Sequence, residues 1–233
     1  MNATKNIINS FSHLFFPHTC AGCGTDLITE EQLLCIQCYS QLPFTGFELY
    51  ADNVVEKNFW GRLPIDSAMS LLYFTKDSII QNLIHQFKYK GKKEIGLYLG
   101  NMMGQKILSS DRFTNIDRLI PLPLFATKEK RRGYNQSFIL CEGIAEILKI
   151  PVLKNSVIRT SATETQTHKT RIERWQNTNG QFEVKESRLL QDKHILLVDD
   201  IVTTGATLEA CALEMMQSCN LRISIATLAY TLI

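Results

Sequence analysis

Hydrophobic residues recur with two different periods between residue 65 and the C-terminus. Apolar residues at helical spacing predict helices over residues 79–87, 94–108, 135–148 and 206–216. Short apolar runs predict strands over residues 68–74, 119–122, 194–198 and 223–229. The run at 194–198 is almost continuously apolar, which is typical of a strand buried on both faces. Strands that alternate with helices predict an α/β fold with a mostly parallel sheet.

The remaining segments do not follow this rhythm. Residues 160–180 are polar and rich in threonine, which predicts a long loop. Residues 1–16 contain apolar residues at the spacing of a short amphipathic helix, namely Ile7, Ile8, Phe11, Leu14 and Phe15. We therefore predict an N-terminal unit over residues 1–45, a connection over 46–64 and an α/β domain over 65–233.

Four of the seven cysteines form two C-x2-C pairs separated by eleven residues: Cys20, Cys23, Cys35 and Cys38. Each pair can direct two sulfurs at one point, and the combined set suits a tetrahedral zinc ion. Four cysteines leave no open coordination position, so the predicted zinc is structural, in a segment too small to fold on its own core. The alternative is a coincidental group of buried thiols.

Composition excludes several classes of protein. The chain has 233 residues, of which 45% are hydrophobic and 21% charged, as in ordinary globular proteins. No apolar run approaches the roughly 20 residues needed to span a bilayer. The apolar residues at the N-terminus are interrupted by polar ones, unlike the core of a signal peptide. We therefore expect a cytoplasmic protein.

The formal net charge of +2 conceals an uneven distribution. Residues 88–132 contain eleven Lys or Arg against four Asp or Glu, which makes this segment +7 and the remainder −5. The charge is concentrated at Lys88, Lys90, Lys92 and Lys93 and at residues 128–132. Such clusters favour a polyanion, either pyrophosphate or nucleic acid, and the four lysines are the candidates for binding DNA. A solvated surface is the alternative, and the interspersed Tyr89 and Tyr134 would either stack on bases or pack internally.

Residues 195–207 carry the most specific chemical signal. A buried strand delivers Asp199 and Asp200 to its carboxyl end, where parallel sheets bind ligands. A Thr-Thr-Gly turn at 203–205 then opens into a helix whose positive end favours a phosphate. The two carboxylates suit the vicinal hydroxyls of a ribose. This stretch therefore predicts a site for a ribose 5-phosphate group, of the kind found in phosphoribosyl pyrophosphate (PRPP).

Other interpretations of this stretch explain less of it. A plain buried strand with a capped helix accounts for the apolar run but not for the paired aspartates and the threonines. A response-regulator receiver also has a strand ending in two aspartates, but its pair lies near the domain start and has no threonine-glycine turn after it. A nucleotide P-loop requires G-x-x-x-x-G-K-[ST], which the sequence lacks.

Residues 198–207 resemble the PRPP motif of type I phosphoribosyltransferases. The four cysteines, the PLP run at 121–123 leading to RRGYNQ at 131–136, and the QTHKTR segment at 166–171 narrow the resemblance. Together these motifs are similar to the competence protein F family (ComF, also called GntX). That family combines a zinc finger with a phosphoribosyltransferase-like domain.

The resemblance implies roles for three groups of residues. The PRPP-binding stretch would be Asp199, Asp200, Ile201, Val202, Thr203, Thr204, Gly205, Ala206 and Thr207. The loop near pyrophosphate would be Arg131, Arg132, Gly133, Tyr134, Asn135 and Gln136. A flap over the site would contain Gln166, Arg171, Arg174 and Asn177. Magnesium would accompany PRPP, because clustered phosphate charge commonly requires a hard cation.

The resemblance also implies a task in natural transformation or the use of external DNA. Members of the family are thought to act on incoming single-stranded DNA, beside a helicase-like partner and DNA-processing proteins. Two alternatives stay open. One is a salvage phosphoribosyltransferase that uses a free base, and the other is a module that binds PRPP without turnover. No residue in the sequence identifies a base or a catalytic proton acceptor.

Overall fold

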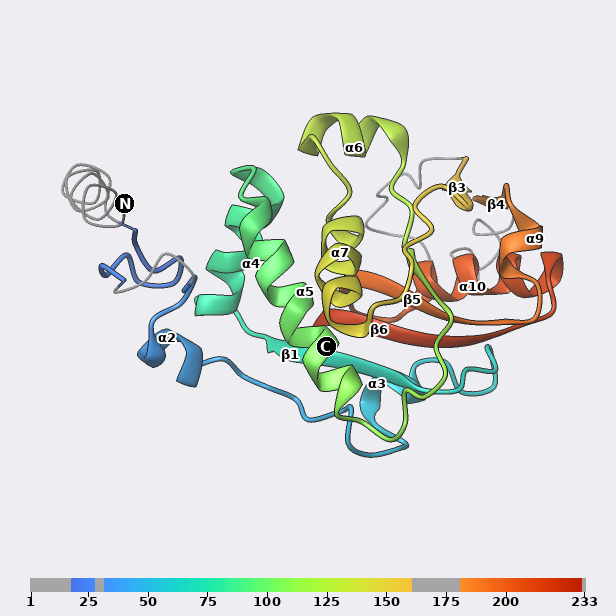
Figure 1. Cartoon of the computed structure of the whole chain (residues 1–233), viewed down its shortest axis with the longest axis horizontal. Coiled ribbons are helices and arrows are strands. Elements are labelled where there is room, and N and C mark those ends of the chain that lie inside the picture. The colour runs from blue at the N-terminus through green and yellow to red at the C-terminus, as the bar shows by residue number, and fades with distance from the viewer. Residues whose placement is uncertain (1–17, 28–31, 161–180, 232–233) are drawn as a thin grey trace, which may run out of the picture.

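The computed structural model describes residues 18–27, 32–160 and 181–231 (Figure 1). The predicted N-terminal amphipathic helix and all four predicted flap residues lie outside these ranges. Within them, no helix is both long enough and apolar enough to cross a membrane.

A four-stranded sheet forms the centre of the molecule. Its order is β1 (Ala68–Phe74), β6 (Leu221–Thr231), β5 (Lys193–Val202) and β2 (Arg118–Pro121), and all three pairings are parallel. The four predicted strands and the parallel α/β class are confirmed. Residues 195–198 of β5 are fully buried, which explains why every one of them is apolar.

The short length of β2 opens one edge of β5. The pairing of β2 with β5 ends at Pro121 and Val198, followed by one more bond from the Leu122 N–H to the Val198 carbonyl. β5 itself continues to Val202 and stays paired with β6 on its other side. The two aspartates therefore begin where the strand loses one neighbour, so ligand groups can approach them.

Three helices stand together above the sheet in Figure 1: α4 (Ile79–Tyr89), α5 (Lys93–Leu108) and α7 (Gln136–Leu148). A fourth, α10 (Ala206–Ser218), packs on β5, β6 and the small antiparallel hairpin of β3 (Val157–Arg159) and β4 (Phe182–Val184). The four predicted helices are confirmed, with ends shifted by one or two residues.

Several short elements were not predicted. They are α2 (Ile36–Ser40), α3 (Val54–Lys57), α6 (Ala126–Arg132), α9 (Ser187–Leu190), β3 and β4. The segment 46–64 also contributes to the core, because Phe47, Val55 and Phe59 in it are almost completely buried. Asn53 caps α3 and its amide donates to the Ala68 carbonyl at 2.8 Å, which attaches this segment to β1.

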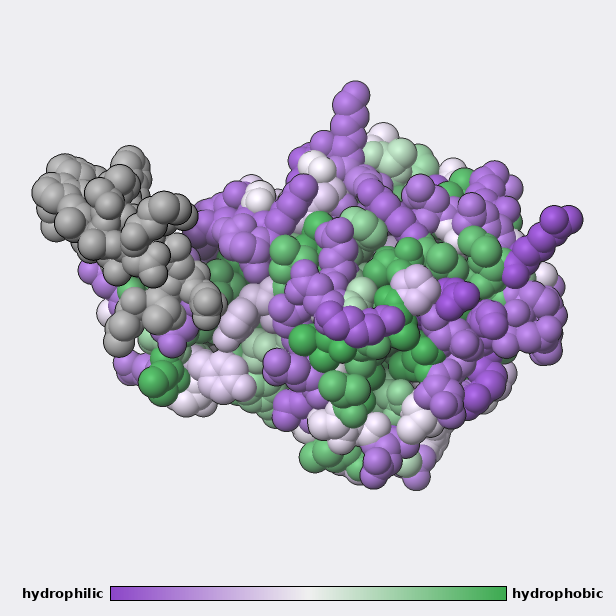
Figure 2. All heavy atoms as spheres, viewed as in Figure 1, coloured by the Kyte–Doolittle hydropathy of each residue, from purple (hydrophilic) through white to green (hydrophobic). Residues whose placement is uncertain are grey.

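The N-terminal cysteine segment is attached to α4. The side-chain amide of Gln86 donates to the Ala21 carbonyl at 2.8 Å, and Asn82 donates to the Gly22 carbonyl at 3.4 Å. The last residue of α4, Tyr89, lies near Arg132 of α6, over which hydrophilic residues gather in Figure 2. α4 therefore connects the cysteine segment with the basic part of the surface.

Glycines allow α5 and α7 to pack with their backbones nearly in contact. Gly96, Gly100 and Gly104 recur every fourth residue along α5, so they share one face. A Cβ atom at Gly100 would lie 2.4 Å from the Leu140 carbonyl oxygen, and one at Gly143 of α7 would lie 2.4 Å from the Leu97 carbonyl oxygen. The helices cannot be this close with any larger residue at these positions.

We predict that Gly100→Ala or Gly143→Ala lowers the free energy of unfolding by about 1–3 kcal/mol, because the added methyl group forces the helices apart. Alanine alone favours a helix interior over glycine by up to about 1 kcal/mol, so the sign of the change is informative. Urea unfolding measures it. Gln105→Ala, on the exposed side of α5, serves as the control, and a neutral or stabilising effect of the glycine substitutions would contradict the close contact.

Candidate functional site

Residues 199–208 form a small open pocket at the carboxyl end of β5. Its volume is about 70 Å³, and its lining consists of Asp199 and residues 201–208. Thr203 and Thr204 are exposed, and Gly205 directly precedes the first residue of α10. The predicted phosphate-binding stretch therefore folds into one continuous concave surface.

Gly205 is required there for two reasons. Its φ angle of +76° lies in the left-handed region that glycine adopts most easily. A Cβ atom at this position would also lie 2.8 Å from the ring of Phe59. No side chain caps α10 at Gly205, so the N–H groups of its first turn are directed at the pocket without a competing cap.

The segment around α3 supports this turn from outside the motif. The amide of Asn58 donates to the Thr203 carbonyl at 3.0 Å. The Arg62 guanidinium contacts the Thr204 carbonyl at 3.4 Å and pairs with Glu209 of α10 at 2.6 Å. Residues predicted only as a connection thus hold the turn at 203–205 in position.

The two aspartates are held by different helices. Asp199 Oδ1 accepts bonds from the Ser137 hydroxyl of α7 at 3.0 Å and from the Asp200 N–H at 2.8 Å. Asp200 Oδ2 lies 2.7 Å from Nζ of Lys88 in α4. Each carboxylate is therefore oriented by a partner distant in sequence.

Burial and the neighbouring charge of Asp200 raise the pKa of Asp199 to about 7. The Asp200 N–H, the Lys88 ammonium and the Ser137 hydroxyl oppose this rise because each favours the ionised form. The pair consequently gains its second negative charge near neutral pH. A ligand that donates hydrogen bonds to both carboxylates is favoured above that range.

The residues predicted near pyrophosphate divide into two groups. Arg131 is exposed and Arg132 half-buried in the last turn of α6, and Gly133 ends that helix with φ +83°. The other three are buried and bonded internally. Tyr134 donates its hydroxyl to the Phe87 carbonyl, and Asn135 caps α7 by accepting from the Ser137 N–H at 2.9 Å.

Gln136 completes this buried group. Its side-chain oxygen accepts from the Arg132 guanidinium at 2.7 Å. The structure therefore presents the arginines as the part of this loop available to an anion, and the buried residues as the support that fixes their position.

The two basic clusters of the sequence meet in space. The Arg132 guanidinium lies 6.0 Å from the centre of the Tyr89 ring, and Lys93 Nζ lies 5.3 Å from that of Tyr134. Tyr89 is 62% exposed whereas Tyr134 is 7% exposed, so only Tyr89 can stack on a base. Lys90, Lys92 and Lys93 are exposed, while Lys88 is turned towards Asp200.

Two residues near the site, Ser137 and Arg159, were missed by the sequence analysis. Ser137 contacts Asp199, as described above. Arg159 of β3 lies 5.3 Å from the Phe182 ring centre, and the charge of Asp199 acts on its guanidinium. Burial and the charge of Arg159 lower the pKa of Lys128, which places Lys128 in the same basic region. Single residues in separate elements leave no pattern in the sequence that could identify them.

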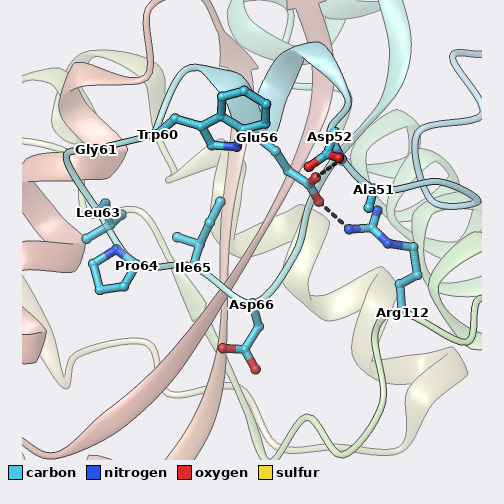
Figure 3. Close-up of a pocket in the computed structure, with 10 residues that line it drawn as sticks. All are labelled: Ala51, Asp52, Glu56, Trp60, Gly61, Leu63, Pro64, Ile65, Asp66 and Arg112. Carbon is cyan, nitrogen blue, oxygen red and sulfur yellow. Dashed lines mark hydrogen bonds and ion pairs between the residues drawn. The ribbon is translucent and has the colours of Figure 1, made fainter.

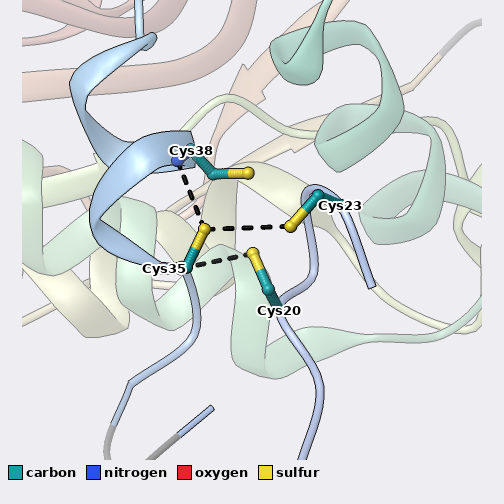
Figure 4. A group of neighbouring side chains, drawn as sticks. All are labelled: Cys20, Cys23, Cys35 and Cys38. Carbon is teal, nitrogen blue, oxygen red and sulfur yellow. Dashed lines mark hydrogen bonds between the residues drawn. The ribbon is translucent and has the colours of Figure 1, made fainter. Parts of the chain in front are cut away.

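The four cysteines predicted as metal ligands converge (Figure 4). Their sulfur atoms all lie within 4.8 Å of one another, and those of Cys23 and Cys35 are 3.8 Å apart. A tetrahedron with metal–sulfur bonds of about 2.3 Å separates its sulfurs by about 3.8 Å. The cluster therefore fits one ion of zinc size.

Backbone groups complete the sulfur cluster. The Cys35 N–H points at Cys20 Sγ at 3.2 Å, and the Cys38 N–H at Cys35 Sγ at 3.4 Å. Such N–H contacts favour thiolates, the form in which cysteine binds a metal. Gly22 is needed because a Cβ atom there would lie 2.8 Å from Cys38 Sγ.

A larger open pocket of about 430 Å³ adjoins the α3 segment (Figure 3). Trp60 and Ile65 contribute to its apolar wall. The buried carboxylate of Glu56 lines this pocket. It pairs with Arg112 and accepts hydrogen bonds from the Asp52 N–H at 2.6 Å and the Ala68 N–H at 3.0 Å. This carboxylate therefore holds the fold together and is not available to a ligand.

Known proteins resemble this chain over most of its length. Residues 135–232 match the model of the phosphoribosyl transferase domain family. The DNA utilization protein YhgH of Salmonella typhimurium is 31% identical over 217 residues, covering 91% of this chain and 90% of that protein. Competence protein F of Haemophilus influenzae is 29% identical over 210 residues, covering 83% of this chain and 89% of that protein.

Among solved structures, a glutamine PRPP amidotransferase from B. subtilis aligns with 60% of this chain and 30% of its own, at 16% identity and a TM-score of 0.40. So distant a likeness supports no inference about ligands. The family match and the extent of the sequence relatives, together with the four-cysteine cluster and the parallel sheet, establish the family. The chain belongs to the competence protein F family, whose relatives include the DNA utilization proteins, and it carries a phosphoribosyltransferase domain.

Proposed function

We propose that this protein binds PRPP at the carboxyl end of β5 and uses it in the handling of incoming single-stranded DNA. The observation that carries the proposal is the continuous pocket formed by Asp199 and residues 201–208. Asp199 in the pocket and the adjacent Asp200 accept the ribose hydroxyls. The turn at 203–207 and the first N–H groups of α10 hold the 5-phosphate.

The pyrophosphate would lie towards α6. Arg131, Arg132 and Lys128 supply positive charge there, and Arg159 adds a guanidinium from β3. Magnesium is expected to accompany the ligand because it screens the clustered phosphate oxygens. The flap residues Gln166, Arg171, Arg174 and Asn177 are proposed to cover the bound ligand.

The basic surface favours DNA as the second ligand. Exposed Lys90, Lys92 and Lys93 adjoin the exposed ring of Tyr89, which combines phosphate neutralisation with a surface for stacking. The relatives' names refer to competence and to the use of DNA. A single strand fits better than a duplex, because stacking on Tyr89 requires an unpaired base.

Transfer of the phosphoribosyl group is the reaction that such a site supports. An acceptor would bond to C1 of the ribose while the bond to pyrophosphate breaks, and pyrophosphate would leave with the electron pair. Measuring pyrophosphate release with PRPP and single-stranded DNA, against a panel of free bases, separates three functions. Release with DNA supports transfer to DNA, release with a base supports salvage, and binding without release supports a PRPP-sensing module.

We predict that the double substitution Asp199→Asn and Asp200→Asn weakens PRPP binding strongly in the presence of magnesium. Each lost charged acceptor costs on the order of 1.5–3 kcal/mol, which corresponds to a total loss of roughly a hundredfold to ten-thousandfold. Isothermal calorimetry measures the affinity. Asp111→Asn serves as the control, because Asp111 is exposed and distant in the sequence from Asp199 and Asp200. Wild-type affinity in the double variant would refute the site.

We predict one zinc ion per chain, bound by the four cysteines as thiolates. Replacing Cys35 and Cys38 together by Ser should abolish zinc binding and destabilise the N-terminal segment, because two ligands of four are lost. Metal analysis of the purified protein gives the stoichiometry. Cys219→Ser, which removes a buried thiol outside the cluster, should leave it unchanged. Protein without zinc, or equal zinc in the double variant, would contradict the assignment.

We predict that binding of single-stranded DNA is largely independent of sequence and weakens steeply with salt, since each neutralised phosphate releases counterions. Replacing Lys90, Lys92 and Lys93 by Ala should weaken binding and flatten its salt dependence, with PRPP binding nearly unchanged. The control with the same loss of charge replaces three other exposed basic residues by Ala: Lys76, Lys185 and Arg188. Titration of a labelled oligonucleotide at several salt concentrations measures both effects.

The contribution of the Tyr89 ring can be tested separately in the same assay. Tyr89→Leu should weaken DNA binding and leave the fold intact, because the exposed ring contributes little to the core. Equal losses of DNA binding from the lysine triplet and from the control triplet, or no binding at low salt, would show that the surface around Tyr89 does not bind DNA.

A further inference from the structure

Lys88 differs from the other lysines of its cluster in direction and burial. It lies in the last turn of α4, and its ammonium is 2.7 Å from Asp200 Oδ2. Both side chains are only 12% exposed. A lysine used for binding DNA would point into solvent, as Lys90 does at the end of the same helix.

In each of the two carboxylates near Lys88, one oxygen is bonded to another group of the protein. Within the described ranges, Oδ1 of Asp199 accepts from Ser137 and from the Asp200 N–H, and Oδ2 of Asp200 contacts Lys88. One oxygen of each carboxylate is left for a ligand. Two acceptors on adjacent residues match the two vicinal hydroxyls of a ribose.

We infer that Lys88 is a positioning residue of the ligand site, which holds Asp200 in place and keeps the Asp199–Asp200 pair ionised for the ribose hydroxyls. The inference rests on the proposed function, because the ribose is the proposed ligand. It moves Lys88 from the DNA surface, where the sequence analysis put it, to the sugar-phosphate site. The expected ligand class is any ribose 5-phosphate with both hydroxyls free.

The electrostatic surroundings determine how this role can be detected. Asp199 faces Asp200 along β5, Lys88 on α4, Ser137 on α7, and more distantly Arg159 on β3 and Cys211 on α10. Burial and Asp200 raise the pKa of Asp199 to about 7, and Lys88 opposes that rise. Without Lys88 the pKa rises further, so at neutral pH the pair retains a proton and offers less charge to the ligand.

The first test is calorimetric binding of PRPP between pH 6 and pH 9. In Lys88→Met, which keeps the length of the side chain, the affinity at pH 7 should fall. If only the ionised pair binds, a rise of one unit in the pKa of Asp199 from about 7 lowers the ionised fraction at pH 7 from about one half to about one tenth, which is a loss of about fivefold. The loss should shrink towards pH 9, where the carboxylates ionise without help. Lys88→Arg should retain most of the affinity, and Lys76→Met, which removes an exposed charge just before α4, should match the wild type at every pH.

The second test does not require PRPP. In the unliganded protein, the carboxyl carbon resonance of Asp199 reports its titration by NMR, and its midpoint should move to higher pH in Lys88→Met. If the wild type binds no PRPP, the proposed function fails and this titration still decides whether Lys88 controls the pair.

Two results would overturn the inference. One is a pair of pH profiles, for Lys88→Met and wild type, that superimpose. The other is an affinity for PRPP that falls by the same factor at every pH, because such a loss would mean that Lys88 contacts the ligand directly and does not act through Asp200.

Discussion

The site depends on two adjacent carboxylates at the point where a buried strand loses one neighbour. Asp199 and Asp200 repel each other and are poorly hydrated, and the pKa of Asp199 is raised to about 7 as a consequence. Such a pair persists only where the surrounding structure stabilises it. Here α4 supplies Lys88 and α7 supplies Ser137, so the packing of both helices on the sheet is needed for the site. The glycine contacts between α5 and α7 contribute to that packing.

Helix α4 also connects the cysteine cluster with the site. Gln86 holds the backbone of the first cysteine pair at Ala21, and Lys88, two residues later, holds Asp200. A metal that fixes the cysteine segment would therefore restrain the helix that orients the carboxylate. This gives a structural zinc a physical relation to ligand binding without placing it in the pocket.

The sequence predicted the parts of the fold that have a period. The central strands and the four long helices were visible because burial imposes a repeat on their apolar residues. The turn at 203–205 and the two aspartates before it were recognisable because these residues are contiguous in the sequence. In contrast, α6 and the β3–β4 hairpin are too short to show a period. The support of Gly205 by Phe59, and of Asp199 by Ser137, joins residues far apart in the chain and leaves no spacing to read.

Lys88 combines a position that the helical period predicts with a partner that the sequence does not reveal. Ile80 and Ile84 are buried on the inner face of α4, and Lys88 follows them at the same interval of four residues. The helical period therefore directs Lys88 inward, although its charge groups it with Lys90, Lys92 and Lys93. A lysine that continues an apolar stripe cannot be solvated like its neighbours, so it requires an anionic partner inside the fold. The carboxylates at the end of β5 provide that partner, and counting charge along the chain could not separate this lysine from those that face solvent.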